Sequence, residues 1–170
     1  MKRLTPDEVI LGLLRLQPAH GYQLLERFQS KAHLGRIWTM STSQLYAVLK
    51  RLEDEGAIKG KRVEMLDAPS RIDYSITEVG EARLMAWLYD PQSPISIHEI
   101  RVMFLSRLYI ASKLGMPVNE ILAYQEEACI KQREKFFAER LTIAAPVEKL
   151  AVEFVIGQLE AALAWIKNVE

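Results

Sequence analysis

The chain has 170 residues, 49% of them hydrophobic, and its 22 basic side chains balance 22 acidic ones. A chain of this length buries about 70% of its unfolded surface and can form one domain or two small ones without a disulfide or a metal. No apolar run approaches the ~20 residues of a membrane-spanning helix, and the opening MKRLTPDEV lacks the apolar core of a signal peptide. We therefore expect a globular chain with no membrane partner and no secretion signal.

Neither half of the chain is strongly charged. Residues 1–90 hold 13 basic and 12 acidic side chains, and residues 91–170 hold 9 and 10. Net charge therefore does not predict a nucleic-acid partner, although a local strip of cations between Lys50 and Arg71 would suffice to bind one. The single Cys129 cannot form a disulfide within the chain, so a reducing, cytoplasmic location is expected.

Two helices are predicted before residue 30. Thr5 is the expected cap of the first helix, Pro6 suits its first turn and Glu8 completes a capping box. Pro18 ends this helix, and the second begins near His20. The residues expected in the core of the two helices are Val9, Ile10, Leu13, Leu14, Leu16, Leu24, Leu25 and Phe28.

The stretch WTMSTSQLYAVLKRLEDEGAI, residues 38–58, predicts a third helix that begins after Ser41 as N-cap and stops at Gly56. Leu45, Val48, Leu49 and Leu52 follow the spacing of one apolar face. The opposite face carries Ser43, Tyr46, Ala47 and Lys50, flanked by Gln44 and Arg51. Small, hydroxyl-bearing and cationic side chains of this kind suit the major groove of DNA. On this stretch alone, an ordinary amphipathic surface helix is an equal alternative.

Residues 58–76 predict a β-hairpin, because two runs with β-branched and aromatic residues flank a break near Pro69. The second run, residues 71–76, alternates apolar and polar side chains and should bury one face. Residues 37–40 are expected to add a short third strand. The basic residues of the hairpin are Lys59, Lys61, Arg62 and Arg71. A helix, a glycine stop and a basic hairpin in this order are typical of a winged helix-turn-helix.

Three segments of the sequence carry a family resemblance. HGYQLLERF at residues 20–28, WTMSTSQLYAVLKRLEDEGAI at 38–58 and RIDYSITEVGEARLMAWL at 71–88 resemble, in this order and spacing, the PadR family of bacterial transcriptional regulators. The tail resembles the longer-tailed branch of that family, which includes phenolic-acid-responsive repressors and virulence-gene activators. The chain departs from the usual pattern at Ser43 (often Gly), Ala47 (often Pro) and Ile72 (often basic), and the last departure leaves the wing less cationic.

After the wing, Thr77 is expected to cap a helix that runs to about Tyr89, and residues 90–94 are expected to form the linker between two domains. Three further helical patterns follow at residues 96–114, 117–142 and 146–169. The predicted fold class is thus mostly α with a small β-hairpin wing. An N-terminal winged helix-turn-helix domain at residues 1–90 precedes a three-helix C-terminal dimerisation domain at residues 95–170.

The last helical pattern has two apolar stripes. One stripe contains Val147, Leu150, Ala151 and Phe154, and the other contains Val155, Ile156, Leu159, Leu163 and Ile166. Because two apolar faces exceed what a three-helix domain needs to bury, we predict that a homodimer contact forms through Ile156, Leu159, Leu163 and Ile166. The alternative is that this surplus stripe packs on the winged domain of its own chain.

The sequence contains no catalytic or metal-binding pattern that we can identify. His20, His33 and His98 lack partners at metal-ligand spacing, and Cys129 is interpreted as a small buried hydrophobe. The acidic runs fall on helix faces expected to be solvated, not in paired positions suited to acid–base chemistry. We therefore expect no enzyme activity and no cofactor.

The sequence thus predicts a dimeric transcriptional regulator that reads an inverted-repeat promoter site in double-stranded DNA. The resemblance implies a repressor or an activator. The predicted DNA contacts are Ser41, Thr42, Ser43, Gln44, Tyr46, Lys50, Arg51, Lys59, Lys61, Arg62 and Arg71. The resemblance implies that some relatives bind a small aromatic effector between the two domains. The alternatives are a winged-helix protein–protein adaptor, favoured by the zero net charge, and a small-molecule binding protein without DNA activity.

Overall fold

The computed structural model describes residues 4–64 and 70–169 and divides into two compact units. The first unit is Met1–Asp90 with Leu105–Pro117, and the second is Pro91–Phe104 with Val118–Glu170. This grouping differs from the predicted division into residues 1–90 and 95–170, because residues 105–117 contact the first unit. The N-terminal limits of that unit and the hairpin break expected near Pro69 lie outside the described residues.

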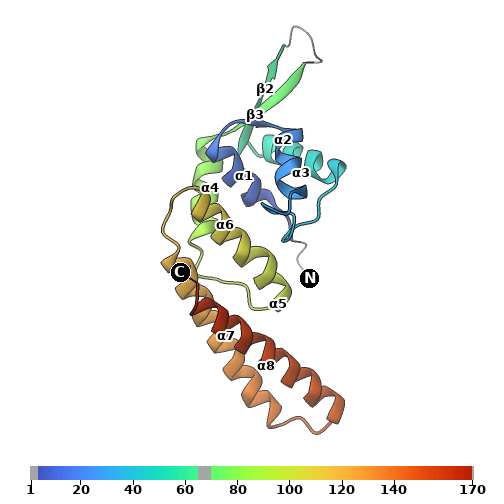
Figure 1. The fold of residues 1–170 in the computed structure, drawn as a ribbon, viewed down its shortest axis with the longest axis vertical. Coiled ribbons are helices and arrows are strands. Elements are labelled where there is room, and N and C mark those ends of the chain that lie inside the picture. Colours follow the sequence, from blue (N-terminus) through green and yellow to red (C-terminus); the bar gives the residue numbers. More distant parts are fainter. Residues whose placement is uncertain (1–3, 65–69, 170) are drawn as a thin grey trace. The chain divides into compact units, whose positions relative to one another are not determined.

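The first unit contains five helices and a three-stranded antiparallel sheet among its described residues (Figure 1). Its helices are α1 (Asp7–Leu16), α2 (Gly21–Gln29), α3 (Thr42–Asp54), α4 (Glu78–Leu88) and α6 (Leu105–Lys113). Its strands are β1 (Ala19–His20), β2 (Ile58–Val63) and β3 (Arg71–Ile76), in the order β1-β3-β2. Helices followed by this β2–β3 hairpin make a winged helix-turn-helix, so the predicted fold class is confirmed.

Local capping explains where the central helices begin and end. Ser41 accepts a hydrogen bond from the backbone N–H of Gln44, whose side chain accepts one from the backbone of Ser41, so α3 begins with a full capping box. Gly56 follows the helix with a φ of +70°, a conformation that glycine adopts without a steric penalty. Thr77 caps α4 by accepting from the N–H of Gly80. These three sequence predictions are confirmed.

Two local predictions are wrong. Residues 37–40 form no strand, and the third strand of the sheet is β1, which pairs Ala19 with Tyr74 and His20 with Asp73. The side chain of Trp38 instead donates a hydrogen bond from Nε1 to the hydroxyl of Ser106 at 2.8 Å. The first helix has Pro6 at its N-cap and no side-chain cap, so Thr5 does not take the expected role.

The core of the first unit is built from the apolar faces of its helices. Its largest fully buried side chains include Ile10, Leu14, Leu24, Phe28, Leu45, Leu49 and Leu84. Gly12 is buried in α1, and a Cβ at this position would overlap the side chain of Ile110. The absent side chain therefore lets α6 approach α1 closely, which explains why residues 105–117 belong to this unit.

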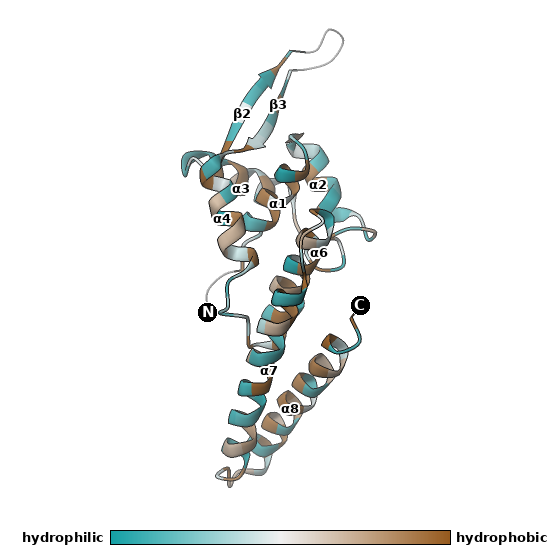
Figure 2. Cartoon of the chain, turned by 90° about the vertical axis from the view of Figure 1, so that its left-hand side faces the viewer, coloured by the Kyte–Doolittle hydropathy of each residue, from teal (hydrophilic) through white to brown (hydrophobic). Residues whose placement is uncertain are grey.

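The second unit contains α5 (Ile97–Glu99), the π-helical turn η1 (Ile100–Phe104), α7 (Asn119–Arg140) and α8 (Pro146–Ile166). The short connection between α7 and α8 places these two long helices side by side as a hairpin (Figure 1). Figure 2 shows many hydrophobic positions along α8. No helix of the described residues is long and apolar enough to cross a membrane.

Candidate nucleic-acid interface

The outward face of α3 has the composition that the sequence predicted. Leu45, Val48, Leu49 and Leu52 are buried, whereas Thr42, Ser43, Gln44, Tyr46, Ala47 and Lys50 are exposed. Tyr46 is the one large ring on this face, and 48% of its surface is exposed. The helix therefore presents a polar surface with one aromatic ring and one lysine to solvent.

The start of α3 uses part of this polar surface to cap the helix. The Oε1 atom of Gln44 accepts from the backbone N–H of Ser41 at 2.9 Å, and the hydroxyls of Ser41 and Ser43 lie 3.1 Å apart. Because these groups are already hydrogen-bonded, they hold the first turn in place. Thr42 is exposed beside them.

The four basic residues of the wing lie on two different faces of the β2–β3 hairpin. In its register Lys59 faces Ser75, Lys61 faces Asp73 and Val63 faces Arg71, whereas Arg62 faces Ile72. Residues directly opposite one another share a face, and successive residues alternate. Lys59, Lys61 and Arg71 therefore share one face, and Arg62 lies on the other.

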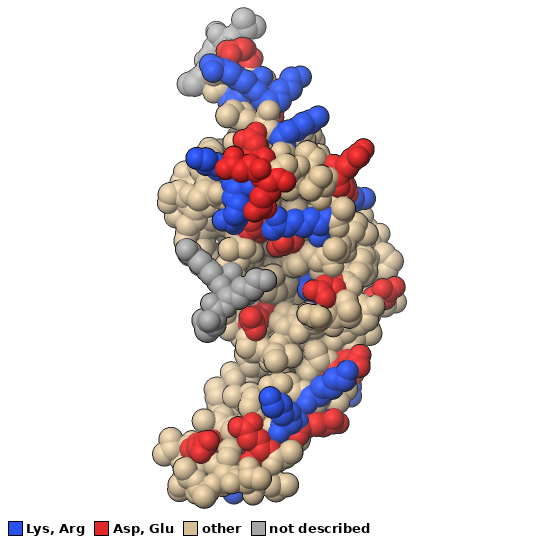
Figure 3. All heavy atoms as spheres, turned by 180° about the vertical axis from the view of Figure 1, so that it is seen from behind, with Lys and Arg blue, Asp and Glu red and all other residues tan. Residues whose placement is uncertain are grey.

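Two of the wing cations are paired with a carboxylate two positions further along the chain. The Nε atom of Arg62 lies 2.8 Å from a carboxylate oxygen of Glu64, and that of Arg71 lies 2.9 Å from one of Asp73. Within residues 4–64 and 70–169, no ion pair is recorded for Lys50, Lys59 or Lys61. Figure 3 shows basic side chains gathered along the wing, with a mixed patch of acidic and basic side chains below it.

Arg51, one of the predicted DNA contacts, is paired with a carboxylate of α1. Its guanidinium donates to both carboxylate oxygens of Asp7, with distances of 2.7 to 2.9 Å. Asp7 lies 44 residues earlier and is 1% exposed. A doubly bonded pair with a buried carboxylate directs the guanidinium toward α1, and the DNA contact predicted for Arg51 stays a prediction.

A hydrogen bond joins the end of α3 to the wing. The Oε1 atom of Glu53 accepts from the backbone N–H of Gly60 at 2.8 Å. Burial, followed by the charge of Glu53 and the influence of Tyr46, raises the pKa of the Tyr74 phenol above its ordinary value of 10.0. Sequence reasoning missed Glu53 and Asp7, because helical periodicity marks both as surface acids and does not reveal a partner from another element.

The residues predicted for dimerisation are covered within their own chain. Ile156, Leu159, Leu163 and Ile166 are at most 5% exposed and lie on the face of α8 that packs along α7. The other stripe is open, since Val147, Leu150 and Phe154 are 80%, 66% and 68% exposed. The stripe predicted for dimerisation is thus buried within its own chain, the other stripe is exposed, and the position of a dimer contact stays a prediction.

A comparison of the sequence with known protein families gives a match over the winged helix. Residues 10–86 match the model described as the transcriptional regulator PadR-like family. Over these residues, the winged-helix unit is similar to the PadR-like family. The match begins within α1, ends within α4 and includes β1, β2 and β3.

Individual PadR-like proteins resemble the chain over different lengths. The negative transcriptional regulator PadR of Bacillus subtilis is 34% identical over 106 residues, which are 62% of this chain and 56% of that protein. A probable transcriptional regulator of Mycobacterium tuberculosis is 29% identical over 89 residues, covering 52% of this chain and 46% of the relative. The chain thus spans about half the length of these curated relatives. The crystal structure of Bacillus subtilis PadR with operator DNA is 24% identical, covers 95% of this chain and 94% of that one, and has a TM-score of 0.49.

Proposed function

We propose that this protein is a DNA-binding transcriptional regulator that recognises an inverted-repeat promoter site. The observation that carries the proposal is the exposed polar face of α3 beside a wing whose lysines have no ion pair among the described residues, in a winged helix that matches a family of transcriptional regulators. A helix of this kind fits the major groove, where base edges carry a distinct pattern of donors and acceptors. Such a regulator would work in the cytoplasm and would need no catalytic centre.

In the proposed complex, the two parts of the interface have different tasks. Ser43, Tyr46 and Lys50 lie on the exposed face of α3 and would contact base edges. Ser41, Thr42 and Gln44 lie at the start of the helix and would contact the DNA backbone. Lys59 and Lys61 would hold phosphates directly. Arg62 and Arg71 would exchange the carboxylates of Glu64 and Asp73 for phosphates, which reduces their net contribution to binding.

The regulator is proposed to act as a homodimer, because an inverted repeat presents two equivalent half-sites. The exposed stripe of Val147, Leu150 and Phe154 on α8 is the proposed contact, in place of the stripe that packs on α7. Burying each such side chain contributes roughly 1.5–3 kcal/mol, and a symmetric contact counts each residue twice.

We further propose that a small aromatic effector regulates DNA binding. This part of the proposal rests on the family resemblance alone. Titrating phenolic acids into the protein–DNA complex tests this part separately. A loss of operator binding at effector concentrations that leave the free protein folded and dimeric supports it.

Selection of bound duplexes from a random pool, followed by sequencing, tests the main proposal. We expect an inverted repeat whose affinity exceeds that of random duplex by about 10³-fold or more. Selected duplexes without a common motif, together with no retention on heparin at low salt, would instead favour the protein–protein adaptor. Quenching of tryptophan fluorescence by aromatic acids without any DNA shift would favour the small-molecule binding protein.

A further inference from the structure

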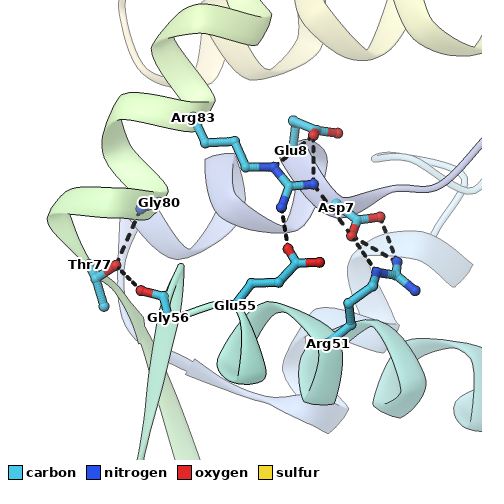
Figure 4. Close-up of polar contacts among 8 residues, drawn as sticks. All are labelled: Asp7, Glu8, Arg51, Glu55, Gly56, Thr77, Gly80 and Arg83. Carbon is cyan, nitrogen blue, oxygen red and sulfur yellow. Dashed lines mark hydrogen bonds and ion pairs between the residues drawn. The ribbon is translucent and has the colours of Figure 1, made fainter.

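A cluster of five charged side chains joins three helices of the winged-helix unit (Figure 4). Its members are Asp7 and Glu8 of α1, Arg51 of α3, Glu55 at the end of α3, and Arg83 of α4. Arg51 donates to both oxygens of Asp7, whereas Arg83 donates from Nε to Glu8 at 3.0 Å and from Nη1 to Glu55 at 2.6 Å. The third nitrogen of Arg83, Nη2, lies 3.6 Å from a carboxylate oxygen of Asp7. We call this cluster the helix clamp.

Asp7 is the buried centre of the helix clamp. Its side chain is 2% exposed, whereas those of Arg51 and Arg83 are 41% and 34% exposed. A buried carboxylate is stable only when it is paired and hydrogen-bonded, so the position of Asp7 depends on Arg51. Burial lowers the pKa of Arg83, but its hydrogen bonds and ion pairs with Glu8, Glu55 and Asp7 outweigh this effect and raise it above the ordinary value.

The helix clamp acts on the half of α3 that follows the exposed ring of Tyr46. Arg51 follows Lys50 directly, and Glu55 is the C-cap residue of the helix. A second link lies at the same end, where the Thr77 hydroxyl donates to the carbonyl of Gly56 at 2.7 Å. The last turns of α3 are thus tied to both α1 and α4, and α4 leads directly to the linker at residue 90.

We propose that Asp7 and Arg83 are positioning residues for DNA recognition, which hold α3 at a fixed angle and withdraw Arg51 from the phosphates. This inference rests on the proposed function, because it assigns a role in DNA binding. A guanidinium that is held by Asp7 makes no phosphate contact, whereas a released one adjoins Lys50 and adds a contact that is blind to sequence. The helix clamp therefore supports specificity and limits non-specific binding.

Asp7→Asn is the direct test, since it keeps the shape of the side chain and removes the charge that holds Arg51. We expect the slope of log affinity against log salt to become steeper by about 0.9 per half-site, with tighter binding to random duplex. The ratio of operator to random-duplex affinity should fall roughly 2- to 30-fold. Glu127→Gln is the matched control. It also neutralises a carboxylate and frees a cation, Lys131, but at an exposed position of α7. Its slope and ratio should equal those of the wild type.

The double variant Asp7→Asn with Arg51→Gln separates the two possible roles of Arg51. If Arg51 makes no DNA contact in the wild type, the salt slope of the double variant returns to the wild-type value. Its ratio of operator to random-duplex affinity stays lowered. A slope lower than that of the wild type by about 0.9 per half-site means that Arg51 contacts phosphate, and it overturns the proposal. An unchanged ratio in Asp7→Asn overturns it as well.

Arg83→Gln provides a second route that leaves the Asp7–Arg51 pair in place. We expect a lowered ratio with an unchanged slope, and circular dichroism should show the same helix content as in the wild type. A folded Arg83→Gln variant with the wild-type ratio overturns the assignment of Arg83. The wild type is measured first. A wild type that prefers no duplex over random DNA overturns the proposed function itself. A wild type with a clear preference, together with variants that keep the same preference, overturns only the role proposed for the helix clamp.

Discussion

The phenol of Tyr46 lies against the backbone of Gly21 at the start of α2, where a Cβ would fall 2.7 Å from the phenolic oxygen. The two residues are 25 positions apart, and each belongs to one helix of the helix-turn-helix pair. A residue that we expected only to face DNA therefore also sets the spacing of α2 and α3. About half of the Tyr46 surface, 48%, stays exposed on the polar outer face of α3.

Gly21→Ala should push the ring of Tyr46 away from α2, because the added methyl group would come within 2.9 Å of three of its atoms. We expect a loss of operator binding of about tenfold with a change in unfolding free energy below about 1.5 kcal/mol, since a terminal ring can move aside. Anisotropy titrations and urea unfolding measure the two effects. Gly157→Ala is the control, since a Cβ there meets nothing within 4 Å, and it should stabilise α8 by roughly 0.8–1 kcal/mol.

A double-mutant cycle identifies the cause of the Gly21→Ala defect. If the defect arises from the displaced ring, Gly21→Ala should cost nothing further in a Tyr46→Ala background, because the obstructing ring is gone. Additive losses would mean that Gly21 acts independently of Tyr46, for example through its own approach to the DNA backbone.

Lys61→Ala should weaken binding to operator and random duplex alike and reduce the salt slope by about 0.9 per half-site. The reason is that Lys61 is an exposed wing cation with no ion pair recorded among the described residues. Lys131→Ala removes an exposed lysine from α7, where it pairs with Glu127, and should leave the slope unchanged. Equal slopes for both variants and the wild type would exclude the wing from the interface.

Leu150→Asp should affect dimerisation, whereas Leu159→Ala should affect the stability of the fold. Leu150 is 66% exposed on the proposed subunit contact, so its replacement by Asp should give folded monomers with weaker operator binding. Leu159 is fully buried, so truncating it should lower the free energy of unfolding by roughly 2–5 kcal/mol. Light scattering and circular dichroism distinguish the outcomes, and a Leu150→Asp variant that remains dimeric would place the contact elsewhere.

The pH dependence of stability should contain a contribution from His33. Burial, together with the charges of Arg27 and Lys113, lowers the pKa of His33 from its ordinary value of 6.5. The folded state therefore favours the neutral ring, which contacts Arg27 and Tyr109. This contribution is complete above pH 6.5 and is lost as the pH falls below 6.5 toward the folded-state pKa, because the unfolded chain takes up the proton first.

His33→Gln removes this titrating group, so the fall in the urea midpoint between about pH 8 and pH 5 should become smaller. His98→Gln changes an exposed histidine and serves as the control. A pH dependence that is the same in His33→Gln and in the wild type would show that His33 does not contribute to it.

Residues close together in the chain determined the winged helix. Ser41 caps α3, Gly56 ends it with a positive φ, and Thr77 starts α4, as expected from the residues next to each helix end. The alternation in residues 71–76 likewise predicted a strand. These features follow from local hydrogen bonding and side-chain period, so one sequence is enough to find them.

Only the tertiary structure decided which partner each surface receives. Periodicity found both apolar stripes of α8, but the packing of α7 covers Leu159 and leaves Leu150 open. By sequence, Arg51 and Lys50 are neighbouring and equivalent cations. In the structure Arg51 pairs with the Asp7 carboxylate of α1, whereas Lys50 is exposed. A helical pattern fixes the direction of a side chain relative to its own helix, whereas its partner depends on how distant segments pack.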